Sequence, residues 1–307
     1  MKSRIARVSG PVLVLAWWIA IWNGAGAAAQ ATRPGDGPAD SKFLRFMPDD
    51  RGGGRLEASV VSYQNGDGVT VDLIAAVHVA DVAFYRDLDK SFARYDALLY
   101  EMIKPRDMDP ATRPSKRYRP AAGQHRSMGW VTMLQQFMKT ALDLSFQLEQ
   151  IDYTAPNFVH ADLDSETFQR MQADRGESML TLMLQQMLRE LSRGEQATAA
   201  EPDLPAIIQA LQSPDRSRQL KLVLARSFSQ MDQMLAGLGG PNGTVIVDER
   251  NRAAMRVLKQ RIAQGDRRLG IFYGAAHLKG MERILTSEMG FKQVGEPKWN
   301  TAWDMTE

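Results

Sequence analysis

Apolar runs of strand length alternate with segments of helical periodicity along most of this chain. An apolar run over residues 69–77 ends at His78, and after a helical pattern over residues 82–95 a shorter run over residues 97–100 ends at Glu101. A strand, a helix and a strand connected at this length favour parallel pairing with a right-handed crossover. This part of the chain is therefore predicted to form one βαβ-like half of an α/β sheet.

A second unit of the same kind lies near the C-terminus. Residues 244–249 have a strand-like pattern, residues 250–264 have a helical pattern closed by Gly265, and residues 269–276 form an apolar run that ends at His277. Open parallel sheets bind ligands beyond the carboxyl ends of their strands. If the two units share one sheet, we expect the residues that follow these strands to lie at one edge.

Other patterns define the rest of the predicted domain. The turn signal Asn65-Gly-Asp-Gly68 follows a strand pattern over residues 56–63 and predicts a hairpin, with an antiparallel strand at the sheet edge. Residues 128–238 are mainly helical in pattern and are interpreted as a large helical insertion. Terminal strands are expected over residues 291–294 and 299–305. The predicted fold is thus a mixed, largely parallel α/β sheet built from two βαβ-like halves with a helical insertion.

The N-terminal segment has the pattern of a secretory signal peptide. Three basic residues precede a short apolar stretch over residues 11–22, and small residues over 24–31 provide cleavage sites. We expect residues 1–29 to be removed and the mature protein to be extracytoplasmic, either periplasmic or secreted. An uncleaved segment that anchors the chain in the membrane is the alternative. Residues 30–55, rich in Gly, Pro and charge, predict a flexible linker before a domain over residues 56–307.

Charge and cysteine content exclude several classes of function. Removal of residues 1–29 lowers the formal net charge from +2 to −1, because this segment contains three basic residues and no acidic one. A nearly neutral mature chain lacks the overall basic surface of a nucleic-acid-binding protein, so we expect no nucleic-acid partner. The chain has no cysteine, which excludes disulfides, thiolate metal sites and a cysteine nucleophile.

The residues at the predicted strand ends supply the candidate chemistry. His78, Glu101 and His277 are two imidazoles and one carboxylate, the donor set of many open catalytic metal sites. Such a site generates hydroxide at neutral pH. The spacing forms no compact metal-binding motif, so the same histidines have two other interpretations, as acid–base catalysts and as hydrogen-bonded structural residues.

Four segments together resemble the TraB/GumN/Tiki superfamily. They are Ile74-Ala-Ala-Val-His78, Leu98-Leu-Tyr-Glu101, Asp248-Glu-Arg-Asn251 and Tyr273-Gly-Ala-Ala-His277-Leu-Lys-Gly280. That superfamily is marked by two G-x-x-H elements, an acidic residue at an intervening strand end, and an E-R-N/D element before the second histidine. The second G-x-x-H element matches in full, whereas Ala75 stands in place of the glycine of the first.

The resemblance implies an exported or membrane-associated hydrolase. Animal Tiki members are metal-dependent proteases, and the related erythromycin esterases are hydrolases. Carried over by position, His78, Glu101 and His277 are the expected catalytic core and the ligands of a divalent metal ion, with Mn, Co and Zn as candidates. Arg250 is the expected electrophile or carboxylate clamp. The expected substrate is a peptide or a small molecule, with peptide-bond hydrolysis as the favoured reaction.

Several neighbouring residues are expected to contact substrate. They are His160, Asn251, Tyr273 and Gly274. Gly274 and the two alanines after it leave room for close approach to His277, and Glu249 is a further candidate in the site. Two alternatives to the metal-dependent hydrolase remain. One is a metal-free esterase or amidase in which His78 or His277 is a general base assisted by Glu101, and the other is a non-catalytic protein that binds or sequesters peptides.

Overall fold

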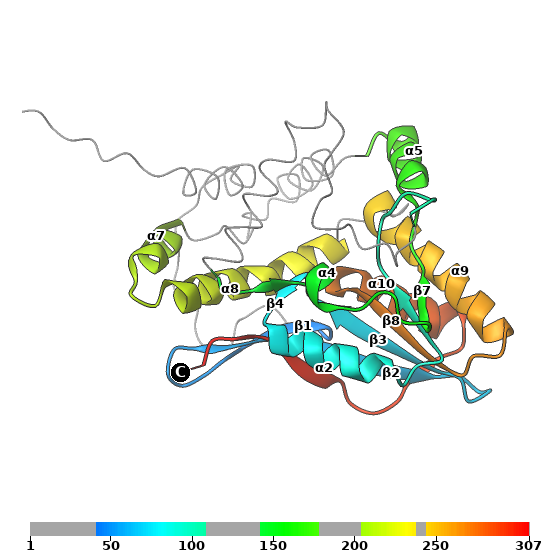
Figure 1. The fold of residues 1–307 in the computed structure, drawn as a ribbon, viewed down its shortest axis with the longest axis horizontal. Helices are drawn as coiled ribbons and strands as arrows, with labels where there is room; N and C mark the ends of the chain where they lie inside the picture. Colours follow the sequence, from blue (N-terminus) through cyan, green and yellow to red (C-terminus); the bar gives the residue numbers. More distant parts are fainter. Residues whose placement is uncertain (1–40, 109–141, 178–203, 238–243, 307) are drawn as a thin grey trace, which may run out of the picture.

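The fold is an α/β arrangement around one mixed sheet, shown in Figure 1. The computed structural model describes residues 41–108, 142–177, 204–237 and 244–306. The predicted signal peptide lies outside these residues, as do the first part of the predicted linker and parts of the predicted helical insertion.

The sheet has the strand order β1-β2-β3-β8-β5-β7, and β9 and β10 also pair with β2. The strands are β1 (Leu44–Pro48), β2 (Gly54–Gln64), β3 (Thr70–Ala76), β5 (Ala97–Tyr100), β7 (Phe158–His160), β8 (Arg268–Gly274), β9 (Lys292–Gln293) and β10 (Lys298–Asp304). β3, β8, β5 and β7 pair in parallel, whereas all pairs that involve β2 are antiparallel. The predicted mixed α/β sheet is confirmed, with the predicted hairpin between β2 and β3 and the two terminal strands.

Helices cover both faces of this sheet. They are α2 (Val82–Phe92), α4 (Gln147–Gln150), α5 (Ser165–Arg175), α7 (Leu204–Gln212), α8 (Arg216–Gly237), α9 (Arg250–Ala263) and α10 (Ala275–Glu288), and β4 (Val79–Ala80) and β6 (Ser145–Phe146) form a small second sheet. Phe92 of α2 packs on Phe272, whereas His277 of α10 packs on Tyr273. Since successive residues of β8 point to opposite faces, α2 and α10 lie on opposite sides of the sheet.

Three sequence predictions are corrected by the structure. The predicted linker contains β1, which pairs with β2, and the predicted helical insertion contains β7, which extends the sheet beside β5. The predicted strand over residues 244–249 is instead the π-helical turn η1 (Val245–Glu249), which leads directly into α9. Thr244 caps it through its hydroxyl, and the Asp248 carboxylate accepts the Thr244 N–H, so reciprocal capping overrides the strand preference of the β-branched residues.

The segment that follows β3 is fixed by contacts from distant parts of the chain. Asp81 accepts hydrogen bonds from Lys221 Nζ of α8 at 2.8 Å and from the Asp304 N–H of β10 at 2.7 Å. The Trp303 indole N–H donates to the Val79 carbonyl at 2.7 Å. The Lys221 side chain is only 9% exposed, so its ammonium depends on Asp81 for a counter-charge. These contacts set the position of His78, three residues before Asp81.

We expect Asp81→Ala to lower the free energy of unfolding by about 3 kcal/mol, because it leaves a buried ammonium unpaired. Urea denaturation measures this change. Asp87→Ala on α2 is the matched control: Asp87 is exposed, and its ion-pair partners among the described residues are the exposed Arg86 and Lys90, so its loss is expected to cost less than about 0.5 kcal/mol. Equal losses in the two variants would contradict the structural importance of the Asp81 contacts.

Candidate functional site

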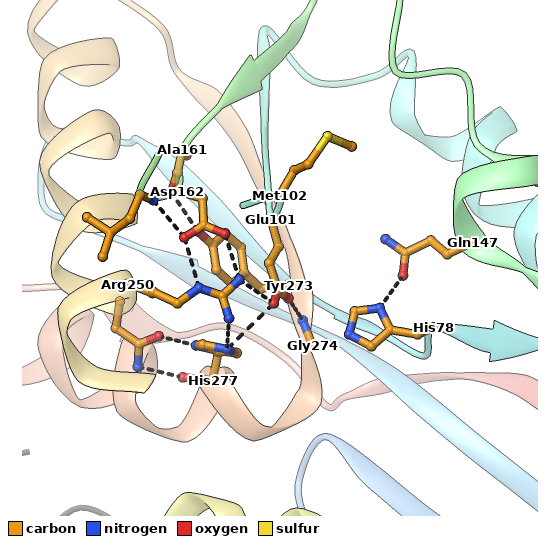
Figure 2. A network of polar contacts seen from close by, with 12 residues as sticks. His78, Glu101, Met102, Gln147, Ala161, Asp162, Arg250, Tyr273, Gly274 and His277 are labelled. Atoms are coloured by element: carbon orange, nitrogen blue, oxygen red, sulfur yellow. Dashed lines mark hydrogen bonds and ion pairs between the residues drawn. The ribbon is translucent and has the colours of Figure 1, made fainter. Parts of the chain in front are cut away.

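The carboxyl ends of the parallel strands gather the candidate residues at one edge of the sheet. β3 and β8 end in register, with Ala76 opposite Gly274, and β5 ends beside them at Tyr100. The residues after these strand ends therefore meet, as Figure 2 shows for His78, Glu101 and Gly274. α10 starts directly after Gly274 and brings His277 to the same place.

Gly274 lies at the centre of this group. A Cβ atom added to it would lie 3.2 Å from Glu101 Oε2, 3.7 Å from His78 Nε2 and 3.8 Å from His277 Cδ2. The two histidines, 199 positions apart in the sequence, thus surround one point together with the predicted carboxylate. The absence of a side chain at Gly274 lets Glu101 and the two histidines approach this point of the backbone closely.

Arg250 forms ion pairs with two carboxylates of the site, those of Glu101 and Asp162. Its guanidinium donates to Glu101 Oε1 at 2.6 Å and makes a two-point contact with Asp162, at 2.6 and 2.9 Å. Its third nitrogen, Nη1, lies 3.4 Å from His277 Nε2. The side chains of Arg250, Glu101 and Asp162 are 9%, 10% and 0% exposed. A buried cation is thus balanced by two buried carboxylates, in the planar two-point geometry for which arginine is suited (Figure 2).

Glu101 is held in its ionised form. Burial alone would raise the pKa of this carboxyl, but His277, Arg250 and His78 and a hydrogen bond from the Gly274 N–H, at 2.7 Å, together lower the pKa to about 2. The opposing contributions act on the same group because the site is both buried and cationic. Glu101 is therefore a carboxylate at neutral pH and not a proton donor.

His277 is buried and neutral. Its Nδ1 lies 2.7 Å from Asn251 Oδ1, and the Asn251 amide also donates to the His277 carbonyl at 3.1 Å. The pattern assigns the ring proton to Nδ1, so the Nε2 lone pair faces Arg250. Burial lowers the pKa of His277 to about 4, outweighing the opposite effect of Glu101. His277 thus accepts a hydrogen bond within the network, and its side chain is only 8% exposed.

His78 differs from His277 because it is exposed. Its Nδ1 lies 3.1 Å from Oε1 of Gln147, and the amide nitrogen of Gln147 donates to the Tyr153 hydroxyl at 2.8 Å. This chain of contacts orients the Gln147 carbonyl toward His78 and assigns the imidazole proton to Nδ1. Among the described residues the Nε2 of His78 has no hydrogen-bond partner, and it lies 3.7 Å from the point that a Cβ on Gly274 would occupy. His78 is the histidine that can exchange a proton with a bound molecule.

The remaining predicted residues form hydrogen bonds with other parts of the chain around the site. Tyr273 is fully buried, and its hydroxyl donates a hydrogen bond to the Ala161 carbonyl at 2.6 Å. The Asn251 side chain forms hydrogen bonds with the ring and the carbonyl of His277. His160 is partly buried, and its Nε2 lies 2.7 Å from the Met102 carbonyl. Their assignment as substrate contacts stays a prediction. Glu249 pairs with Arg175 and Arg252 and makes none of the site contacts.

Asp162 is the residue that the sequence prediction missed. Its side chain is fully buried and binds the Arg250 guanidinium at two points. The signal for it is the same one that identified Glu101: an acidic residue shortly after a short apolar run, here Phe158-Val159. The run is so short that the surrounding helical patterns obscured it.

The donor set does not fit a metal centre formed by His78, Glu101 and His277. Glu101 Oε1 and His277 Nε2 both face Arg250, at 2.6 and 3.4 Å, so a permanent cation already stands where these two ligands converge. A divalent ion bound there would lie against the guanidinium and be repelled by it. In the part of the chain that the structure describes, no group of three or more His, Cys, Asp or Glu residues has the geometry to hold a metal ion.

Comparisons with family models, with curated proteins and with solved structures found no match to this chain. Within residues 41–108, 142–177, 204–237 and 244–306, none of the helices combines the length and the apolar character that crossing a membrane requires.

The neutral state of His277 predicts a pH-dependent stability. Its pKa is depressed from 6.5 to about 4 in the folded protein, so below pH 6.5 the unfolded chain binds a proton that the folded chain does not. Stability is therefore lost as the pH falls from 6.5 toward 4, by about 3 kcal/mol from this group. Urea denaturation from pH 7 to pH 4 measures it. His277→Gln lacks the titrating group, so parallel curves for the variant and the wild type would refute the buried, neutral state.

Proposed function

We propose that this protein is a metal-independent hydrolase of ester or amide bonds, peptide bonds included, with His78 as the general base. The observation that carries the proposal is an exposed histidine at the strand ends whose Nδ1 is held by Gln147, while its Nε2 lies 3.7 Å from the point that a Gly274 Cβ would occupy. Ligands of α/β sheets bind at this edge. General base catalysis needs a nitrogen lone pair within hydrogen-bonding reach of a water molecule.

The proposed reaction uses the groups around Gly274 in sequence. His78 Nε2 takes a proton from water while the water oxygen attacks the substrate carbonyl carbon. The Glu101 carboxylate, fixed by Arg250 and the Gly274 N–H, stabilises the imidazolium that forms. His78 then returns the proton to the leaving alkoxide or amine as the bond to the carbonyl carbon breaks. Arg250 and the Gly274 N–H keep Glu101 ionised and in place, Asp162 positions Arg250, and Asn251 positions His277.

The sequence resemblance supports the same class of function. The TraB/GumN/Tiki superfamily includes metal-dependent proteases and is related to esterases, so the resemblance leaves the role of a metal open. The signal-peptide pattern of residues 1–29 supports export from the cytoplasm. The substrate is accordingly a peptide or a small ester or amide encountered outside the cytoplasm.

Metal assistance is the second candidate, because the sequence resemblance implies it and two of the predicted ligands, His78 and Glu101, both lie close to Gly274. Dialysis of the active protein against a chelator separates the two candidates. We expect turnover to be retained. Loss of turnover that Mn, Co or Zn restores would establish the metal-dependent hydrolase instead, and saturable peptide binding with no turnover in either state would establish a peptide-sequestering protein.

We expect His78→Gln to lower kcat/KM by about 100-fold or more, the contribution of a general base, on whichever member of a panel of nitrophenyl esters and peptides is hydrolysed. The melting temperature should stay within a few degrees because His78 is exposed. Glu166→Gln, an exposed acidic residue on α5, is the surface control, and Glu101→Gln should impair turnover and also lower the melting temperature, because it removes one counter-charge of the buried Arg250. Full activity of His78→Gln would rule out its role as the base.

Gln147 is a positioning residue, and its test is a pH profile. In Gln147→Glu a carboxylate replaces the amide carbonyl beside His78 Nδ1, 3.1 Å away in the wild type. A carboxylate favours the protonated imidazole, so the acid limb of the kcat/KM profile should move to higher pH by about one unit. Gln150→Glu, on the same short helix, serves as the charge-matched control. An unmoved acid limb in Gln147→Glu would show that Gln147 does not act on His78.

A further inference from the structure

A cleft lies between α9 and α10, outside the strand-end site. Its volume is about 270 Å³, close to the lower end of the usual range for small-molecule pockets, about 300–1,000 Å³. Its apolar lining comes from Met255 and Ile284, and its floor from Asn251 and Gly280. The size fits a small molecule or ion and is too small for a peptide segment.

The floor of the cleft depends on a close approach of the two helices. A Cβ atom on Gly280 would lie 2.5 Å from Asn251 Nδ2, so only glycine lets α10 pass over this amide. Asn251 in turn holds both the ring and the carbonyl of His277. A molecule on the floor of the cleft would therefore touch the side chain that fixes His277.

The rim of the cleft is basic. Its charged side chains are Arg252, Arg256, Lys259 and Arg283 against Asp248 and Glu288. Arg252 is paired with Glu249, and Asp248 caps the Thr244 N–H. Among the residues that the structure describes, Arg256, Lys259 and Arg283 have no acidic group in ion-pair contact. Three exposed cations from two helices thus line one cleft in which basic side chains outnumber acidic ones.

We propose that this cleft binds a small anion that carries a phosphate or carboxylate group. Arg256 and Lys259 on α9 and Arg283 on α10 would hold the charged group from both sides, since arginine and lysine are the usual ligands of such oxygens. The apolar lining would receive the remainder of the molecule. A molecule bound in the cleft would contact Asn251 and so change the environment of His277. The binding does not depend on the proposed hydrolase activity.

The test is a titration of the full-length protein with inorganic phosphate, followed by NMR of its methionine and isoleucine methyl groups. We expect saturable shifts of the Met255 and Ile284 methyls, which line the cleft. Arg256→Ala and Arg283→Ala should each weaken binding by about tenfold, the loss expected for one charged hydrogen bond. Lys279→Ala, an exposed cation on α10 that does not line the cleft, should leave binding unchanged.

Sodium chloride at matched ionic strength is the reference titration. Shifts that fail to saturate, that chloride reproduces, or that Lys279→Ala weakens as much as Arg283→Ala would overturn the anion site and leave a solvated basic surface. The ring signal of His277 tests the connection through Asn251. It should move with the same saturation curve as the Met255 methyl, and an unmoved ring signal during saturable binding would overturn that connection.

Discussion

The buried guanidinium of Arg250 is the interaction around which the site is organised. A permanent cation at 9% exposure requires counter-charges, and the carboxyl end of β5 and the segment after β7 each provide one. Arg250 also begins α9, where the helix dipole disfavours a positive charge. The carboxylates of Glu101 and Asp162 offset both the burial of the guanidinium and its unfavourable interaction with the helix dipole. Buried ion pairs contribute little net stability, so the network is better understood as a device that fixes the relative positions of β5, β7, α9 and α10.

The same network separates the two histidines into different roles. His277 lies between Arg250 and Asn251, which contact both of its nitrogens, and burial together with the nearby Arg250 cation lowers its pKa. His78 lies on the other side of Gly274, where Gln147 uses one nitrogen and leaves the other free. Two identical side chains at the ends of adjacent strands therefore differ through burial and hydrogen bonding alone. The separation of chemically equivalent groups by their environments is the usual origin of acid–base function.

Sequence patterns could predict the parts of this site that follow long apolar runs. The strands before His78, Glu101 and His277 are recognisable by length, and the rule for parallel sheets places their ends together. The η1 turn was not predictable from β-branched residues, because the capping by Thr244 and Asp248 is decisive. Asp162 follows a three-residue strand, and its partner Arg250 lies 88 positions away. No local pattern carries information on such a contact.

The presence of an arginine at the convergence of Glu101 and His277 limits the chemistry open to the site. A metal ion lowers the pKa of a bound water to about 7 and so generates hydroxide directly. A guanidinium has no vacant coordination position and cannot bind the water oxygen as a Lewis acid. In the proposed hydrolysis, the proton of the attacking water would then pass to a side chain that acts as the base. His277 is buried and the pKa of Glu101 is far below its ordinary value, so the exposed His78 beside Gly274 is the residue to which the proposal assigns this role.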